Sequence, residues 1–227
     1  SLAVQESVRD VYGAALPHYF KYIANGKEST EPKLEHVRDL DSDDPRATVN
    51  VLACTGDWFG GWDGVLTPEG DRYANKEATE GRMVEVIQRG EPAIMLCHWP
   101  GMYCNGGKQG FQAFQQVVKA LHHRFADQTI WMKVSEIAQY WAAKKLTTIN
   151  REPDGVALRA PFACTGFTLE MHAAKNQVPQ IVVGNTKTPL KEIKDARRLR
   201  SGTWVRRGTK STICFDLAVG SSVIRFT

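Results

Sequence analysis

The chain lacks any apolar run that approaches the eighteen or so residues of a membrane-spanning helix, and its mean hydropathy is −0.35. A membrane-spanning helix is therefore excluded. The Gly-x-Ser-x-Gly elbow, the P-loop and the Gly-x-Gly-x-x-Gly fingerprint are absent too. These absences disfavour serine hydrolases, P-loop nucleotidases and dinucleotide-binding proteins. Aromatic and β-branched residues occur along the whole chain, which excludes a disordered protein.

Cysteine is scarce and scattered, with five residues and no Cys-x-x-Cys or Cys/His ligand spacing: Cys54, Cys97, Cys104, Cys164 and Cys214. This spacing disfavours a structural zinc site. The odd number favours buried thiols over a disulfide framework.

Charge is unevenly distributed along the 227 residues. Residues 1–150 hold 16 Lys and Arg against 19 Asp and Glu, and residues 151–227 hold 13 against 6. The net charges of −3 and +7 predict two units with different surfaces. The basic segment, residues 151–227, lacks aromatic residues interleaved with its charges, so nucleic-acid binding is disfavoured. We expect the pairs 197–198 and 206–207 to be solvated arginines flanking strands, with an anionic-glycan site as the alternative.

Residues 1–150 carry an α/β pattern. Short apolar runs predict buried strands at 48–54, 93–97 and 129–132, and helical spacing predicts helices at 77–89, 111–125 and 134–145. Residues 3–24 also have helical spacing, interrupted at Pro17. Strands alternating with helices indicate a parallel sheet, whose functional loops follow the carboxyl ends of the strands.

Residues 151–227 change to short strands separated by turn residues. The expected strands are 156–158, 167–171, 180–183, 204–205, 212–217 and 222–226. This pattern predicts an all-β, antiparallel sandwich of about 75 residues. The expected domain boundary lies at residues 150–151.

One constellation of residues suggests chemistry. Asp57 and His98 each follow a predicted strand, so the two side chains could meet as a carboxylate and a general acid or base. Trp58, Trp62 and Trp99 occupy the same two loops, and Tyr103 extends the second loop. Aromatic faces around such a pair suggest a carbohydrate groove. The alternatives are a histidine that only makes structural hydrogen bonds and tryptophans that fill space beneath long loops.

These residues resemble the last two motifs of the NodB-type polysaccharide deacetylases, a family of carbohydrate esterases. The matching segments are Asp57-Trp58 and Leu96-Cys97-His98. The resemblance implies a partial, distorted (β/α) barrel over residues 1–150, followed by the accessory β-sandwich. It also implies that His98 protonates the leaving group, that Asp57 tunes His98, and that Trp58 and Leu96 line the acetyl pocket.

The metal-binding motifs of that family, an Asp-Asp pair and a His-x-x-x-His pair, do not occur together in this chain, and the adjacent His122 and His123 are wrongly spaced. The resemblance therefore implies that a longer parent supplies a zinc-like divalent ion and that this chain alone is inactive. The missing part would be an N-terminal remainder of the barrel or a second copy. The family's location would be secreted or periplasmic.

Two hypotheses about function remain. The first is a deacetylase-like protein whose intact parent hydrolyses acetyl groups from a glycan, with His98 and Asp57 as catalytic residues. The second is a non-catalytic carbohydrate-binding or interaction protein that keeps the groove formed by Trp58, Trp62 and Trp99.

Overall fold

A computed structural model describes residues 2–13, 16–24, 27–56, 68–172 and 177–227. Contacts between residues divide the chain into two units. Unit 1 comprises residues 1–18, 34–49 and 135–227, and unit 2 comprises residues 19–33 and 50–134. The boundary predicted at residue 150 lies inside strand β4 of unit 1.

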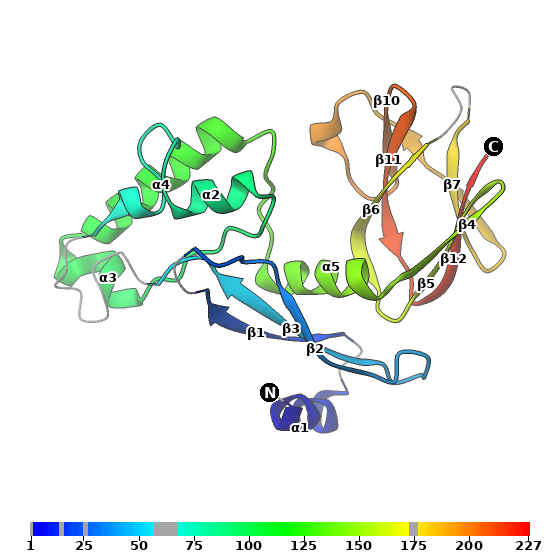
Figure 1. Ribbon diagram of the computed structural model, residues 1–227, viewed down its shortest axis with the longest axis horizontal. Helices are drawn as coiled ribbons and strands as arrows, with labels where there is room; N and C mark the ends of the chain where they lie inside the picture. The colour runs from blue at the N-terminus through cyan, green and yellow to red at the C-terminus, as the bar shows by residue number, and fades with distance from the viewer. Residues whose placement is uncertain (1, 14–15, 25–26, 57–67, 173–176) are drawn as a thin grey trace. The chain divides into compact units, whose positions relative to one another are not determined.

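The described residues contain five α-helices and twelve strands (Figure 1). The helices are α1 Leu2–Tyr12, α2 Arg82–Gln88, α3 Trp99–Tyr103, α4 Gln109–Phe125 and α5 Val134–Leu146. The first six strands are β1 His18–Ile23, β2 Lys33–Arg38, β3 Arg46–Ala53, β4 Thr148–Glu152, β5 Gly155–Ala160 and β6 Cys164–His172. The others are β7 Pro179–Val183, β8 Thr186–Pro189, β9 Lys191–Glu192, β10 Thr203–Arg207, β11 Lys210–Leu217 and β12 Gly220–Phe226. Three short 3₁₀ helices lie at η1 Gly70–Arg72, η2 Cys104–Gly106 and η3 Ala196–Arg198.

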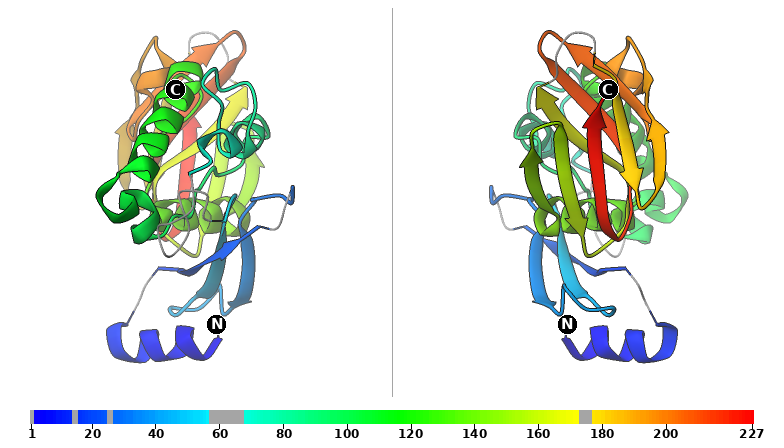
Figure 2. Two further views of the ribbon diagram at one scale, coloured as in Figure 1. Left: turned by 90° about the vertical axis from the view of Figure 1, so that its left-hand side faces the viewer. Right: turned by 90° about the vertical axis from the view of Figure 1, so that its right-hand side faces the viewer.

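Most of unit 1 is built from two sheets. One has the strand order β4–β5–β12–β7–β8, with β12 (red) between β5 and β7 in the right-hand view of Figure 2. The other has the order β6–β11–β10–β9. Neighbouring strands in these two sheets run antiparallel, except that β9 runs parallel to β10. A third sheet has the order β1–β3–β2, and the boundary between the two units falls within β3.

The core of unit 1 follows from the period-two alternation of its strands. Along β5, Val156, Leu158 and Ala160 are buried, while the two residues between them are not. The side chains of Ile213 and Phe215 on β11 join the same apolar cluster, which includes residues from both sheets and from α5. Phe215 meets Phe167 edge to face, with 5.8 Å between the ring centroids, a favourable arrangement of aromatic rings.

Unit 2 has a separate core, in which α2 and α4 bury their apolar faces. Met83, Val84 and Val86 come from α2, and the apolar face of α4 adds residues such as Val117 and Leu121. The helix predicted at 111–125 is confirmed by α4, and the helix predicted at 134–145 is confirmed by α5 of unit 1. The helix predicted at 77–89 begins later, at Arg82.

The predicted fold class, a partial (β/α) barrel with a separate all-β sandwich, is wrong. Strands outnumber helices in the described residues, they form three sheets, and none of these sheets closes into a barrel. Two of the three strands on which the barrel prediction depended do not form. Residues 93–97 and 129–132 have no strand conformation, and Ile130 and Trp131 are 80% and 76% exposed. An apolar run of four or five residues does not by itself specify a strand.

The N-terminal segment also differs from its prediction. Helix α1 ends at Tyr12, and residues 18–23 form strand β1 instead of a second helical segment. The run from Tyr19 to Ile23 is rich in aromatic residues, which favour strands. Pro17 separates the two elements, because it cannot supply the backbone hydrogen bond that a continuing helix requires.

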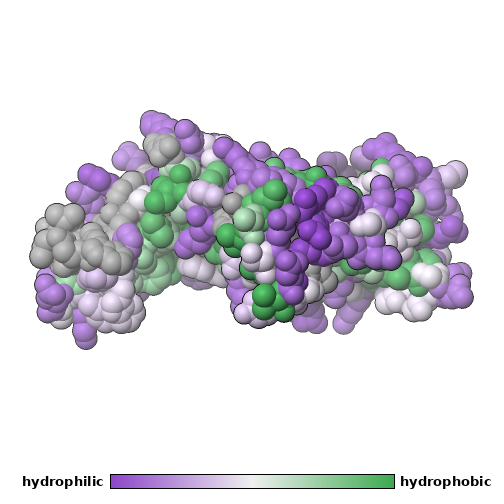
Figure 3. Space-filling model, turned by 90° about the horizontal axis from the view of Figure 1, so that it is seen from below, coloured by the Kyte–Doolittle hydropathy of each residue, from purple (hydrophilic) through white to green (hydrophobic). Residues whose placement is uncertain are grey.

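The surface of the protein agrees with the low mean hydropathy of the sequence. No helix within the described ranges is both long enough and apolar enough to cross a membrane. On the face seen in Figure 3, hydrophobic residues form small patches between hydrophilic ones. All five cysteines are free thiols. Burial is confirmed for Cys54, Cys164 and Cys214, whereas Cys97 is exposed and Cys104 is partly exposed.

Candidate functional site

The residues predicted to form a site divide into two groups. Three of them lie outside the described residues: Asp57, Trp58 and Trp62. The other four lie in unit 2, on helix α3 or just before it: Leu96, His98, Trp99 and Tyr103. The pairing of Asp57 with His98 therefore stays a prediction.

Leu96 and His98 precede helix α3 in an irregular segment. The carbonyl oxygen of Leu96 accepts a hydrogen bond of 3.4 Å from the hydroxyl of the buried Tyr73. His98 is the N-cap residue of α3, with an extended backbone (φ −90°, ψ 143°), and its side chain makes no capping hydrogen bond. The segment thus leads directly into the helix that carries the two predicted aromatic residues.

Trp99 and Tyr103 are brought together by α3. They are four residues apart, which places them on the same face of a helix. Their ring centroids are 4.7 Å apart, and the ring planes are inclined by 47°. Trp99 is 74% exposed and Tyr103 is 40% exposed. The result is a solvent-facing aromatic pair on a helix of only five residues.

A close approach to α4 holds this short helix in place. Gly101 of α3 and Gly110 of α4 are both buried, and a Cβ atom on Gly110 would lie 2.0 Å from the carbonyl oxygen of Gly101. The thiol of Cys104 donates a 3.0 Å hydrogen bond to the same oxygen. Only a glycine at 110 allows the backbones to approach so closely.

The turn between α3 and α4 contains unusual backbone conformations. Cys104, Asn105 and Lys108 have φ values of 45°, 53° and 60°, in the left-handed region that residues with a Cβ atom seldom adopt. The Lys108 amide donates a 2.7 Å hydrogen bond to the carbonyl of Tyr103, which closes the turn. Such conformations cost on the order of 1–3 kcal/mol each and concentrate at functional sites.

The polar face of α4 forms a shallow hollow of about 400 Å³ within unit 2. Its lining includes three glutamines, two lysines and one histidine: Lys76, Gln112, Gln115, Gln116, Lys119 and His123. Glutamine amides both donate and accept hydrogen bonds, which suits a ligand rich in hydroxyl groups. The sequence analysis did not predict this hollow, although each of the five residues from Gln112 to His123 lies three or four positions from another of them in the sequence.

A divalent ion does not fit the residues that are described. No group of three or more His, Cys, Asp or Glu side chains with metal-binding geometry occurs in that part of the chain. His122 and His123 are adjacent and exposed on α4, so the structure gives them no closer likeness to the His-x-x-x-His pair of the deacetylase family than their spacing does.

Comparisons with known proteins give no family. No protein-family model matches the chain, and no curated protein or solved structure is significantly similar to it.

Proposed function

We propose that this protein binds a carbohydrate on the exposed aromatic face that Trp99 and Tyr103 form on helix α3. The observation that carries the proposal is the contact between these two rings, with 74% of Trp99 left in solvent. Sugar rings present C–H groups on their faces, and a large aromatic ring offers them an apolar, electron-rich surface.

The way in which the pair is held supports a binding role. The Gly101–Gly110 approach fixes the middle of α3, and the hydrogen bond from Lys108 to Tyr103 fixes its carboxyl end, before any ligand arrives. A surface ordered in advance loses less conformational entropy when it binds. The glutamine-lined hollow on α4 supplies hydroxyl-binding groups in the same unit.

The test is a titration of the full chain with neutral oligosaccharides, namely cello-, xylo- and chito-oligosaccharides, by calorimetry and tryptophan fluorescence. We expect Trp99→Ala to weaken binding by about 2 kcal/mol, which is about thirtyfold in Kd. Trp131→Ala is the matched control, because Trp131 is 76% exposed in the same unit. Equal losses in both variants, or no binding by the wild type, would overturn the proposal.

Two measurements on the same protein distinguish carbohydrate binding from the deacetylase hypothesis. Binding is expected to survive both a chelator and His98→Ala, because no group of three or more potential metal ligands occurs among the described residues and the proposed contacts are made by Trp99 and Tyr103. The second measurement is acetate release from acetylated xylan and chitin oligosaccharides with added zinc. Release that requires His98 would replace the binding proposal with the hydrolytic one.

A further inference from the structure

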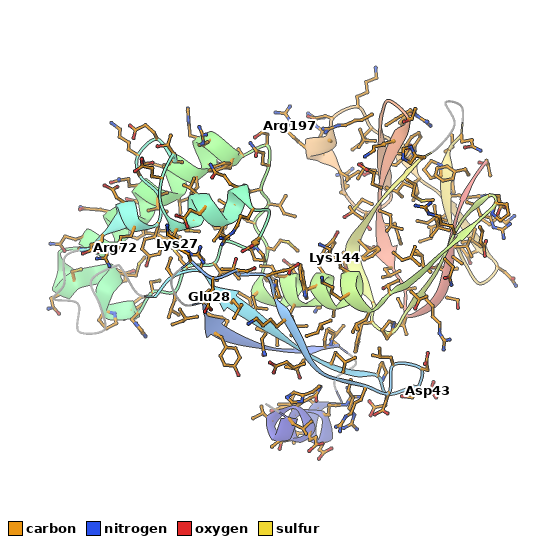
Figure 4. The ribbon with its side chains drawn as sticks, viewed as in Figure 1. Lys27, Glu28, Asp43, Arg72, Lys144 and Arg197 are labelled. Atoms are coloured by element: carbon orange, nitrogen blue, oxygen red, sulfur yellow. The ribbon has the colours of Figure 1, made fainter. Side chains whose placement is uncertain are left out.

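A strongly basic segment of unit 1 comprises strand β9 and most of its connection to β10. Residues 191–200, here called the basic loop, contain five Lys and Arg residues and two acidic ones. The five are Lys191, Lys194, Arg197, Arg198 and Arg200, and all are exposed. The loop stands clear of the strands in Figure 1, and Figure 4 shows Arg197 directed away from both sheets.

The basic loop is held in one conformation by hydrogen bonds at both of its ends. The Lys191 amide donates to the carbonyl of Gly202 at 3.0 Å. The Arg200 amide donates to the buried hydroxyl of Thr203 at 2.9 Å, and the amide of Thr203 donates to the carbonyl of Arg200 at 3.0 Å. The cationic side chains therefore project from an ordered backbone.

Most of this charge is not neutralised within the described residues. Arg197 pairs with Asp195 at 3.0 Å, and hydrogen bonds from the Arg197 side chain and backbone lower the pKa of Asp195. By contrast, Lys194, Arg198 and Arg200 have no carboxylate oxygen within 4.0 Å in the part of the chain that is described. Clustered cations repel one another, so an anionic ligand would relieve that repulsion.

We propose that the basic loop binds an acidic polysaccharide, one that carries carboxylate or sulfate groups along its length. Arginine forms paired hydrogen bonds to planar or tetrahedral oxyanions, and three of the five cations are arginines. This site uses other residues, in the other unit, than the aromatic face of α3, so it does not depend on the function proposed above.

Protection of a sheet edge explains only part of the charge. Lysine on an edge strand discourages pairing with another chain, and Lys191 lies on β9 at the edge of its sheet. The three arginines lie beyond that strand, on or just after η3. Arginines at these positions do not protect the edge strand from pairing with another chain. The presence of three arginines there therefore needs another explanation.

A nucleic acid is the less suitable polyanion. Proteins that bind single strands stack bases on exposed aromatic rings. In the described residues 177–227, Trp204 and Phe215 are each 1% exposed, and Phe226 is half-buried against the core. The basic loop itself contains only one three-residue 3₁₀ helix, too short to read a major groove.

The experiment measures binding of the full chain to polygalacturonate, heparin, neutral dextran and a 20-base-pair DNA duplex, over about 50–300 mM salt. The test variant is Lys194→Ala/Arg198→Ala/Arg200→Ala. The control is Arg151→Ala/Lys210→Ala/Arg225→Ala, which removes three exposed cations from β4, β11 and β12 of the same unit. Thermal unfolding of each variant shows whether it is folded, and Arg198→Lys/Arg200→Lys serves as a conservative variant.

We expect polygalacturonate or heparin to bind and dextran not to bind. The test variant should bind about tenfold more weakly, and the slope of log Kd against log salt should fall by about two to three. The control variant should retain most of the affinity. The lysine variant keeps the charge but not the paired hydrogen bonds, so it should keep the salt slope and lose less affinity than the test variant. Equal losses in the test and control variants, tighter binding of the duplex than of both polysaccharides, or no binding at about 50 mM salt would each overturn the proposal.

Discussion

The buried Gly110 of α4 lies so close to Gly101 of α3 that a Cβ atom at position 110 would be 2.0 Å from the Gly101 carbonyl oxygen. Because α3 carries both Trp99 and Tyr103, this approach positions the aromatic face as well as the helix. The function proposed for unit 2 thus depends on a residue that has no side chain.

Gly110→Ala should destabilise the protein by about 2 kcal/mol, because the new methyl group meets backbone atoms that cannot move aside. In an uncrowded helix the same change would stabilise by up to about 1 kcal/mol, so the sign is diagnostic. Denaturant unfolding measures it. The control is Gly56→Ala, where no atom of the described residues lies within 4 Å of the new methyl group and little change is expected.

Glu91 should contribute to stability in a pH-dependent way. Burial raises the pKa of Glu91, but hydrogen bonds from Thr30 and Ser29 and the charge of Arg89 outweigh it, so the pKa is lowered. One Glu91 oxygen accepts from the Thr30 amide at 2.7 Å and from its hydroxyl at 3.1 Å. Because the folded pKa is depressed, this stabilisation is present above the ordinary value of 4.5 and is lost as the pH falls through the folded pKa.

We therefore expect Glu91→Gln to cost about 2 kcal/mol of unfolding free energy at neutral pH and progressively less in acid. Denaturant unfolding of both proteins over a range of pH tests this expectation. Glu80→Gln, at an exposed position, is the control and should change the free energy by less than about 0.5 kcal/mol at every pH. A cost for Glu91→Gln that is the same at all pH values would contradict the electrostatic explanation.

The thiols should differ strongly in reactivity. Burial raises the pKa of Cys54 to about 11, and burial together with the charge of Asp216 raises the pKa of Cys164 to about 11. Both thiols therefore stay protonated and unreactive near pH 8, whereas Cys97 is exposed. Labelling of the native protein with an aromatic disulfide reagent should show a fast phase that Cys97→Ser removes. Cys54→Ala should leave that phase unchanged, and fast labelling of Cys54 before unfolding would contradict its burial.

Local patterns predicted many elements because their burial follows a simple period. Each of the six short strands predicted after residue 150 overlaps a strand of the structure, and α4 and α5 lie close to their expected bounds. The short apolar runs 93–97 and 129–132 did not become strands, although each follows a turn, because apolar residues can also lie in an irregular segment. Ala93 and Met95 contact the core of unit 2 in that way. The backbone of this segment is satisfied by bonds from distant residues, such as the 2.7 Å bond from the Cys54 amide to the Ile94 carbonyl.

The two-part charge distribution, the strands after residue 150, the amphipathic helices and the aromatic residues around position 99 could all be predicted from the amino-acid pattern. Three features could not: the strands form three open sheets instead of a barrel, Trp99 and Tyr103 meet on a five-residue helix, and the β9–β10 connection is an ordered cationic loop. Periodicity indicates only which side of an element is buried. The partner that buries it, and the backbone contacts that fix a loop, involve residues far apart in the chain.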